Sequence, residues 1–115
     1  MKKQKRGESQ SEAMRQRWER RIVAEKAYDG NTAEWMALRL EALLDHMLCG
    51  HALIAYRKQN GEFRPVKATL VITGGDFHKE FDPGKIDGAV VHWDVEQQGW
   101  RTFQVENFLE WRPVI

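Results

Sequence analysis

Residues 89–111 read AVVHWDVEQQGWRTFQVENFLEW, and this stretch decides the fold. Its first part, 89–96, is an apolar run rich in β-branched and aromatic residues, and residues 100–104 again contain aromatic and β-branched residues. Between them lie Gln97, Gln98 and Gly99, which is the composition of a tight turn. The stretch therefore predicts two neighbouring strands joined by a short hairpin.

The end of this stretch predicts how the domain closes. Alternation along the strand 100–104 places Phe103 and Trp100 on opposite faces. Residues 105–109 are too few for a stable α-helix and fit a single 3₁₀ turn. We expect that turn to plug one end of a barrel with Phe108 and Leu109.

The residues before this stretch supply the other strands. Residues 51–58 and 63–73 alternate with period two and are separated by Gln59-Asn60-Gly61-Glu62, which contains the Asn-Gly hairpin signal. Residues 74–88 carry turn residues at both ends and predict a long loop. EWRPVI, 110–115, predicts a short final strand. Five short strands with a 3₁₀ turn before the last one are typical of a small SH3-like or Sm-like barrel.

The N-terminal part of the chain predicts two helices. The first covers 12–28, with Ser9 or Ser11 as its N-cap, and Met14, Trp18 and Ile22 form a narrow apolar stripe along it. The second is expected to be capped by Thr32 and to end at Gly50 in the left-handed conformation.

The second helix is apolar over most of its circumference, so it must be covered on more than one side. The first helix and the barrel offer two covers, and a second copy of the chain would be a third. A homodimer through the helices is therefore expected. The apolar residues concerned are Trp35, Met36, Leu38, Leu40, Leu43, Leu44, Met47 and Leu48.

Together these elements predict an α+β protein in which an N-terminal helical hairpin packs on a small five-stranded SH3/Sm-like β-barrel. The predicted boundaries are a basic flexible tail at 1–8, a two-helix segment at 9–50 and the barrel at 51–115.

The sequence also resembles a known family. Residues 89–111 are similar to the strand–turn–strand core of the WYL domains of bacterial regulators. The likeness is closer to the small stand-alone WYL-like proteins of bacterial and mobile-element genomes, described as Sm-like SH3-barrel proteins. In those, a hairpin like Tyr56-Arg57-Lys58-Gln59-Asn60-Gly61 opens the domain, and a helix like the one containing Ser11-Glu12-Ala13 and Trp18 precedes it.

The resemblance implies a function as well as a fold, with departures. WYL domains are thought to sense nucleic acid or nucleotides through basic and aromatic side chains, and Arg101 is the member of that set that carries over. The Trp-Tyr-Leu tripeptide that gives the larger family its name is absent, and Gly88-Ala89-Val90 occupies its place. Asn107 stands where those domains often carry an arginine in the final turn. The resemblance further implies a bacterium, a phage or a mobile element as the source.

The charge distribution favours a polyanion or an acidic protein as partner. Residues 1–30 carry nine Lys/Arg against five Asp/Glu, and the remaining 85 carry nine against twelve, so a net charge of +1 hides a basic N-terminal end. Basic residues interleaved with aromatics are also typical of barrels that bind single strands. The candidate residues for binding nucleic acid or a partner are Arg15, Arg17, Arg20, Arg21, Arg57, Lys58, Arg64, Lys67, His92 and Arg101.

Other chemistry is less well supported by the sequence. His46, Cys49 and His51 lie close together but lack the second close ligand pair of a structural zinc site, so no metal and no cofactor is expected. The carboxylate pairs Asp94/Glu96 and Asp82/Asp87 lie at turns, where carboxylates are usually solvated, and no nucleophile with an adjacent base stands out. We expect no enzyme activity.

These observations predict a non-enzymatic accessory or regulatory protein that binds RNA or single-stranded DNA through the basic helix and one barrel face. Two alternatives remain open: a protein-binding inhibitor of a host defence nuclease, acting on the nuclease or its complex, and a nucleotide-binding sponge with residues 74–88 as its lid. A single cysteine and the lack of a long apolar stretch predict a cytoplasmic protein without membrane contact.

Overall fold

The structure is a computed structural model, and it describes residues 8–71 and 88–115. The predicted tail up to residue 7 and the predicted loop from 74 to 87 lie outside the described residues. The elements are helices α1 (Glu8–Lys26) and α2 (Gly30–Met47), strands β1 (His51–Arg57), β2 (Phe63–Thr69), β3 (Ala89–Asp94) and β4 (Gly99–Gln104), the 3₁₀ turn η2 (Val105–Asn107) and strand β5 (Phe108–Pro113).

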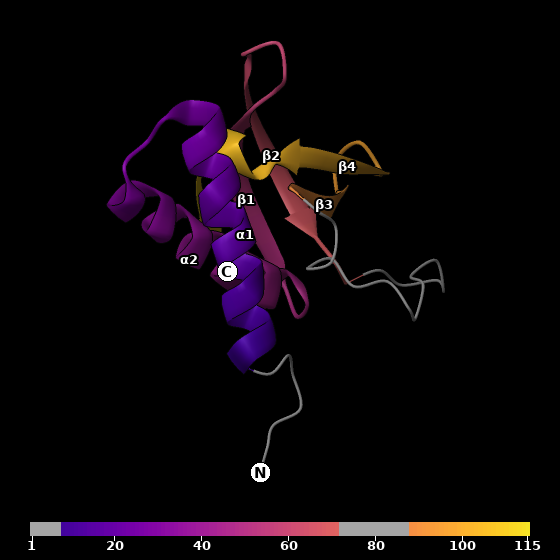
Figure 1. The fold of residues 1–115 in the computed structure, drawn as a ribbon. Coiled ribbons are helices and arrows are strands. Elements are labelled where there is room, and N and C mark those ends of the chain that lie inside the picture. Colours follow the sequence, from indigo (N-terminus) through magenta and orange to yellow (C-terminus); the bar gives the residue numbers. More distant parts are fainter. Residues whose placement is uncertain (1–7, 72–87) are drawn as a thin grey trace.

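The five strands form one antiparallel sheet in the order β4-β3-β2-β1-β5. In Figure 1, β4 runs across the direction of β1 and β2, so the sheet is curled, and both helices lie on the same side of β1. This is the predicted α+β architecture of two N-terminal helices followed by a five-stranded SH3/Sm-like barrel.

Helix α1 packs through one narrow stripe. Met14, Trp18 and Ile22 are 1%, 2% and 0% exposed, as their four-residue spacing predicts. The helix begins at Glu8, however, so Ser9 and Ser11 lie inside it and the prediction that one of them is the N-cap was wrong. Serine has only a moderate helix penalty, and the helix formers around it carry the first turn.

Helix α2 is capped one turn earlier than predicted. The Oδ1 atom of Asp29 accepts a hydrogen bond from the backbone N–H of Thr32 at 2.7 Å, and Asp29 has extended backbone angles. This hydrogen bond lowers the pKa of the Asp29 carboxyl. Asp29 is therefore the N-cap, and Thr32 lies in the first turn because a carboxylate at the cap is the stronger acceptor for the free N–H groups.

The end of α2 also differs from the prediction. The helix ends at Met47, Leu48 keeps right-handed helical angles, and Gly50 is not among the residues with positive φ. Backbone hydrogen bonds from Leu48 to Leu44 and from Cys49 to His46 continue the last turn without a left-handed residue. The predicted left-handed Gly50 was therefore wrong.

The apolar circumference of α2 is only partly covered. Its buried residues face α1 and strands β1 and β5, but Trp35 and Leu38 are each 47% exposed and Leu48 is 51% exposed. The structure holds one chain, so the predicted homodimer stays a prediction. The buried residues are Ala33, Met36, Ala37, Leu40, Leu43, Leu44 and Met47.

Around β4 and η2 the alternation holds. Phe103 is 3% exposed and Trp100 is 41% exposed, which confirms that they point to opposite faces. Phe108 is buried at 2%, whereas its neighbour Leu109 is 38% exposed. Only Phe108 closes the core, because consecutive residues of the extended strand β5 point to opposite sides.

Candidate functional site

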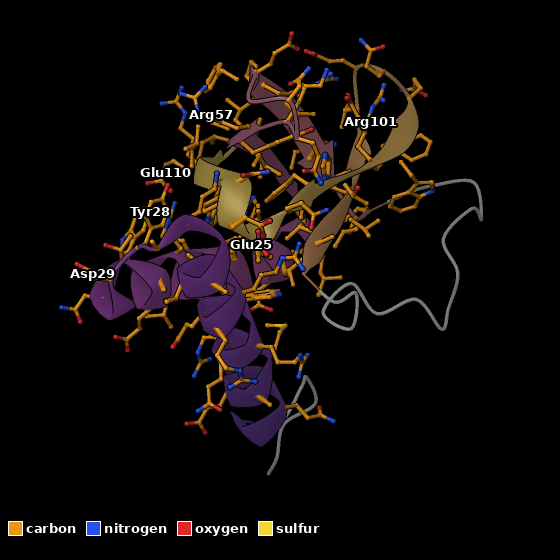
Figure 2. All side chains as sticks on the ribbon, turned by 45° about the horizontal axis from the view of Figure 1, so that its top comes forward. Glu25, Tyr28, Asp29, Arg57, Arg101 and Glu110 are labelled. Atoms are coloured by element: carbon orange, nitrogen blue, oxygen red, sulfur yellow. The ribbon has the colours of Figure 1, made fainter. Side chains whose placement is uncertain are left out.

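A groove opens at the end of the barrel, between the β1–β2 hairpin on one side and β4 with η2 on the other. We call it the mouth groove; it has a volume of about 430 Å³. Arg57 and Arg101 stand on its two sides in Figure 2. Its lining residues are Tyr56, Arg57, Lys58, Gln59, Asn60, Arg64, Arg101, Thr102, Phe103, Gln104 and Asn107.

The lining is strongly cationic. Arg57, Lys58, Arg64 and Arg101 contribute four positive charges, and no acidic residue is among the lining residues that the structure describes. Lys58 forms an exposed ion pair with Glu62 at 3.4 Å, a type of contact worth little in water. The groove therefore offers several cationic donors to an anion.

Strand pairing explains why two of these arginines converge. Arg64 of β2 lies opposite Tyr56 of β1, and Arg101 of β4 lies opposite His92 of β3. Residues directly opposite each other share a face of the sheet, and Tyr56 and His92 are both buried. Both arginines therefore start from the concave face and reach its open end.

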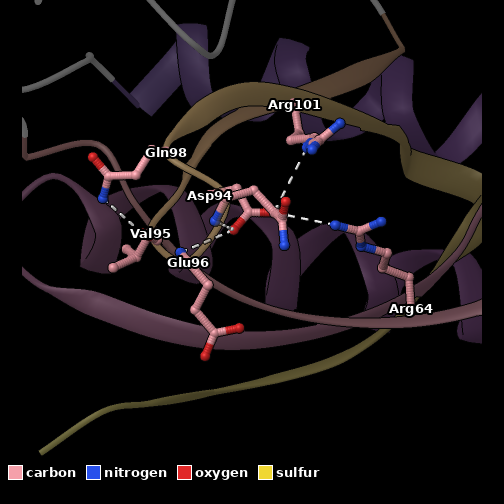
Figure 3. Close-up of polar contacts among 7 residues, drawn as sticks. Arg64, Asp94, Val95, Glu96, Gln98 and Arg101 are labelled. Atoms are coloured by element: carbon pink, nitrogen blue, oxygen red, sulfur yellow. Dashed lines mark hydrogen bonds and ion pairs between the residues drawn. The ribbon is translucent and has the colours of Figure 1, made fainter.

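Asp94 lies beneath the two arginines and is 1% exposed. Figure 3 shows the contacts: Arg64 donates from Nη2 to Oδ2 at 3.2 Å, and Arg101 places Nε 3.6 Å from the same oxygen. One carboxylate thus orients two guanidinium groups whose outer donors remain directed at the groove. The local charge of this cluster is +1, which favours binding of a further anion.

The β3–β4 turn holds Asp94 in its ionised form. The backbone N–H groups of Glu96 and Gln97 donate to Oδ1 at 3.1 and 2.9 Å. Burial alone would raise the pKa of Asp94, but these backbone hydrogen bonds together with Arg64 outweigh it and lower the pKa. The prediction that Asp94 is a solvated turn carboxylate was therefore wrong.

The floor of the groove is a cluster of aromatic rings. Tyr56 stacks on Phe103 with ring centroids 4.6 Å apart, and Phe103 lies 6.3 Å from Phe108. Burial raises the pKa of the Tyr56 hydroxyl, while the positive charges of Arg64 and Arg101 oppose that rise. Tyr56 and Phe103 are 4% and 3% exposed, so the rings support the groove and offer little surface for stacking.

His92 belongs to this cluster and not to the surface. It is 0% exposed, its ring lies 6.0 Å from that of Tyr56 and 5.7 Å from that of Phe103, and neither ring nitrogen has a hydrogen-bond partner among the described residues. Burial lowers the pKa of His92 to about 4. The sequence predicts His92 as a binding residue, but its position on β3 points its side chain into the core, where it is not accessible to a ligand.

The arginines of α1 do not join the groove. Arg15 is paired with Glu41 at 2.8 Å and Arg21 with Glu106 at 2.8 Å, so both hold the helix against the rest of the molecule. Arg17 and Arg20 are exposed on α1, a helix in which five basic residues are nearly balanced by four acidic ones. The helix is thus less suited to a polyanion than its arginine count suggests.

Of the ten candidate residues, the structure brings four together in the mouth groove: Arg57, Lys58, Arg64 and Arg101. Lys67 lies on the opposite face of β2, where it pairs with Leu53. Sequence reasoning missed the orienting role of Asp94. An aspartate directly before a four-residue turn, able to accept from the N–H groups two and three residues on, is the signal that could have found it.

Among the described residues, no three His, Cys, Asp or Glu side chains are grouped so that they could hold a metal ion. Helices α1 and α2, the two that the structure describes, are not long and apolar enough to cross a membrane.

The fold and groove define a small binding domain of the SH3-barrel class. A family model matches residues 40–109, that of the WYL_2 family with an Sm-like SH3 beta-barrel fold. The chain belongs to this family, which confirms the resemblance found in the sequence. Comparison with curated proteins gives no match, and comparison with solved structures gives none either.

Proposed function

We propose that this protein is a non-enzymatic regulatory binding protein that holds a single strand of nucleic acid, RNA or DNA, in the mouth groove. The observation that carries the proposal is the convergence of Arg64 and Arg101 on one buried carboxylate, in a groove whose described lining residues include four cations and no anion. Guanidinium groups held in this way match the geometry of phosphate oxygens.

The rest of the lining suits bases as well as phosphates. Gln59 and Asn107 present amide groups that can donate and accept hydrogen bonds. The amide oxygens of Asn60 and Gln104 already accept from Glu62 and Arg21, which leaves their amide NH₂ groups as donors to a ligand. Base edges that are not paired in a duplex offer the complementary donors and acceptors, which favours a single strand over a duplex. The chain's WYL_2 membership supports a regulatory or binding role of this kind.

The lining offers little for catalysis. No His, Cys, Asp or Glu is among the described lining residues, and the ionisable side chains that do line the groove, those of Tyr56, Lys58 and the arginines, serve less often as general bases. This supports the proposal that the bound strand is held and not cleaved.

The proposal is tested by fluorescence anisotropy with labelled oligouridylate and oligothymidylate over a series of salt concentrations. Arg57→Ala and Arg101→Ala should each weaken binding by about tenfold and reduce the slope of log K against log salt by about one. Arg17→Ala, an exposed arginine outside the groove, is the matched control and should change neither. If Arg57→Ala and Arg101→Ala have the same affinity and the same salt slope as Arg17→Ala, the proposal is contradicted.

A nucleotide sponge is the second candidate, because the groove volume of about 430 Å³ lies in the range of small-ligand sites. Calorimetry with a mononucleotide and an oligonucleotide separates the two functions. Equal affinity per site for the mononucleotide and the oligonucleotide would favour the sponge. An affinity that rises steeply with the length of the oligonucleotide would favour strand binding.

A further inference from the structure

The outer face of the sheet carries a second surface, which surrounds a hollow whose lining residues are not those of the mouth groove. On β1, Ala52, Ile54 and Tyr56 are buried on the inner face, while Leu53 between them is 40% exposed. Both helices lie on the inner side of the sheet (Figure 1). Neither helix therefore covers the outer face of β2, β1 and β5.

The centre of this face is apolar. Leu53 and Ala55 of β1 lie beside Pro65 of β2, with Phe63 at the end of the same strand, and Phe63 is 56% exposed. A shallow hollow of about 390 Å³ runs over Leu53, Ala55 and Pro65 towards β5. We call Leu53, Ala55, Phe63 and Pro65 the outer patch. Exposed apolar clusters of this kind on a small protein are typical of interaction sites.

Cations flank the outer patch on both sides. In the strand register Leu53 lies directly opposite Lys67 of β2 and directly opposite Arg112 of β5. Neither Lys67 nor Arg112 has an ion-pair partner among the residues that the structure describes. Among the described residues, two carboxylates beside the patch are already paired: that of Glu110 with Arg39 at 2.8 Å, and that of Glu62, next to Phe63, with Lys58 at 3.4 Å. The rim is therefore positive.

We propose that the outer patch docks an acidic segment of a partner protein, with one apolar side chain of that segment seated on Leu53 and Pro65 and its carboxylates meeting Lys67 and Arg112. Complementary charge around an apolar anchor is the usual arrangement of a specific protein interface. A nucleic acid fits less well, because three of the four patch residues are aliphatic and give a base no ring on which to stack.

The test uses synthetic peptides and the complete chain labelled with ¹⁵N. The probe is a peptide with a central Phe-Leu pair flanked by glutamates, and amide shifts report where it binds. We expect the shifts to concentrate on Leu53, Lys67 and Arg112. The same peptide with lysines in place of the glutamates, and one with serines in place of Phe-Leu, should bind at least about tenfold more weakly, since each loses one of the two interactions.

Matched variants test the surface itself. Leu53→Glu should weaken binding of the acidic peptide by about tenfold. The double variant Lys67→Glu with Arg112→Glu should weaken it equally, because both changes place negative charge beside the carboxylates of the peptide. Leu38→Glu, the same change at a similarly exposed position on α2, should leave binding unchanged. If Leu53→Glu fails to fold, Lys67→Ser gives a milder test of the same contact.

The outcomes are distinct from those of the mouth groove. No shift with the acidic peptide, shifts confined to residues of the mouth groove, or shifts at the outer patch with oligouridylate instead of the peptide would each overturn the inference. Arg101→Ala should not change peptide binding, so failure of the proposed nucleic-acid function would leave this result intact.

Discussion

Arg21 of helix α1 donates from Nε to Oε1 of Glu106 in η2 at 2.8 Å, across 85 positions of sequence. The same guanidinium donates from Nη2 to Oε1 of Gln104 at 2.9 Å, and Gln104 lines the mouth groove. Gly88 makes room for this contact, since a Cβ there would come within 2.7 Å of Nη1 of Arg21. An arginine of the basic helix thus braces one wall of the groove.

Arg21→Ala should lower the free energy of unfolding by about 2 kcal/mol, because the carboxylate of Glu106, only 8% exposed, would lose its paired charge. Thermal or urea unfolding measures the loss. Arg17→Ala, an exposed arginine on the same helix, should change the free energy by about 0.5 kcal/mol or less. Similar values for the two variants would mean that the Arg21–Glu106 pair contributes nothing measurable.

Ala27 ends helix α1 in the left-handed conformation, with φ of 58°, and its N–H donates to the carbonyl of Val23 at 2.9 Å. A residue with a Cβ pays about 1 kcal/mol for this conformation, so Ala27→Gly should stabilise the protein by up to about 1 kcal/mol. Ala24→Gly, three residues earlier in the helix, should destabilise by about 1 kcal/mol. Urea unfolding of the two variants compares them, and the same sign for both would contradict the explanation.

Arg39 and Trp111 hold α2 against β5 through contacts in both directions. Arg39 donates from Nη2 to the carbonyl of Trp111 at 2.6 Å, the indole Nε1 donates to the carbonyl of Arg39 at 2.9 Å, and the guanidinium lies 4.8 Å from the centre of a Trp111 ring. Arg39→Ala should therefore cost about 1 to 2 kcal/mol of stability in urea unfolding. Arg112→Ala, on the exposed side of β5, should cost about 0.5 kcal/mol or less, and an equal cost would refute the role given to Arg39.

The strands were predictable from sequence because period-two alternation and turn residues are local signals. Phe103 and Trp100 point to opposite faces for that reason, and the Asn-Gly turn joins β1 to β2 as expected. The cap of α2 was not predicted correctly, because Asp29 and Thr32 are both good caps and the choice depends on backbone angles that composition does not fix.

The mouth groove was predictable only in part. Charge and proximity in sequence singled out Arg57, Lys58 and Arg64, and the family resemblance singled out Arg101. The contact of Arg21 with Glu106 is tertiary, and no local pattern reports it. The burial of His92 and Asp94 follows from the alternation of β3. His92 lies two residues after Val90 and two before Asp94, so all three share one face, and the apolar Val90 could have indicated that this face points inward.

The buried His92 makes stability depend on pH in a defined window. Its pKa in the folded protein is lowered to about 4 by burial, against about 6.5 in an unfolded chain, so only the unfolded state binds a proton between these values. Proton uptake by the unfolded state therefore lowers the free energy of unfolding as the pH falls from about 6.5 towards 4, by about 3 kcal/mol in total, and has no effect above pH 6.5. Urea unfolding at a series of pH values should show this decline in the parent protein.

His92→Leu should remove the decline between pH 6.5 and 4, and at neutral pH it should cost little or stabilise, because both ring nitrogens of His92 lack a hydrogen-bond partner among the described residues. His51→Gln is the control for a histidine outside this cluster and should keep the decline. Asp94 does not mimic the effect: its pKa is lowered from 3.8, so the stability it contributes is lost only at pH values below this window. An unchanged pH profile in His92→Leu would show that the proton is taken up elsewhere and that His92 does not control acid stability.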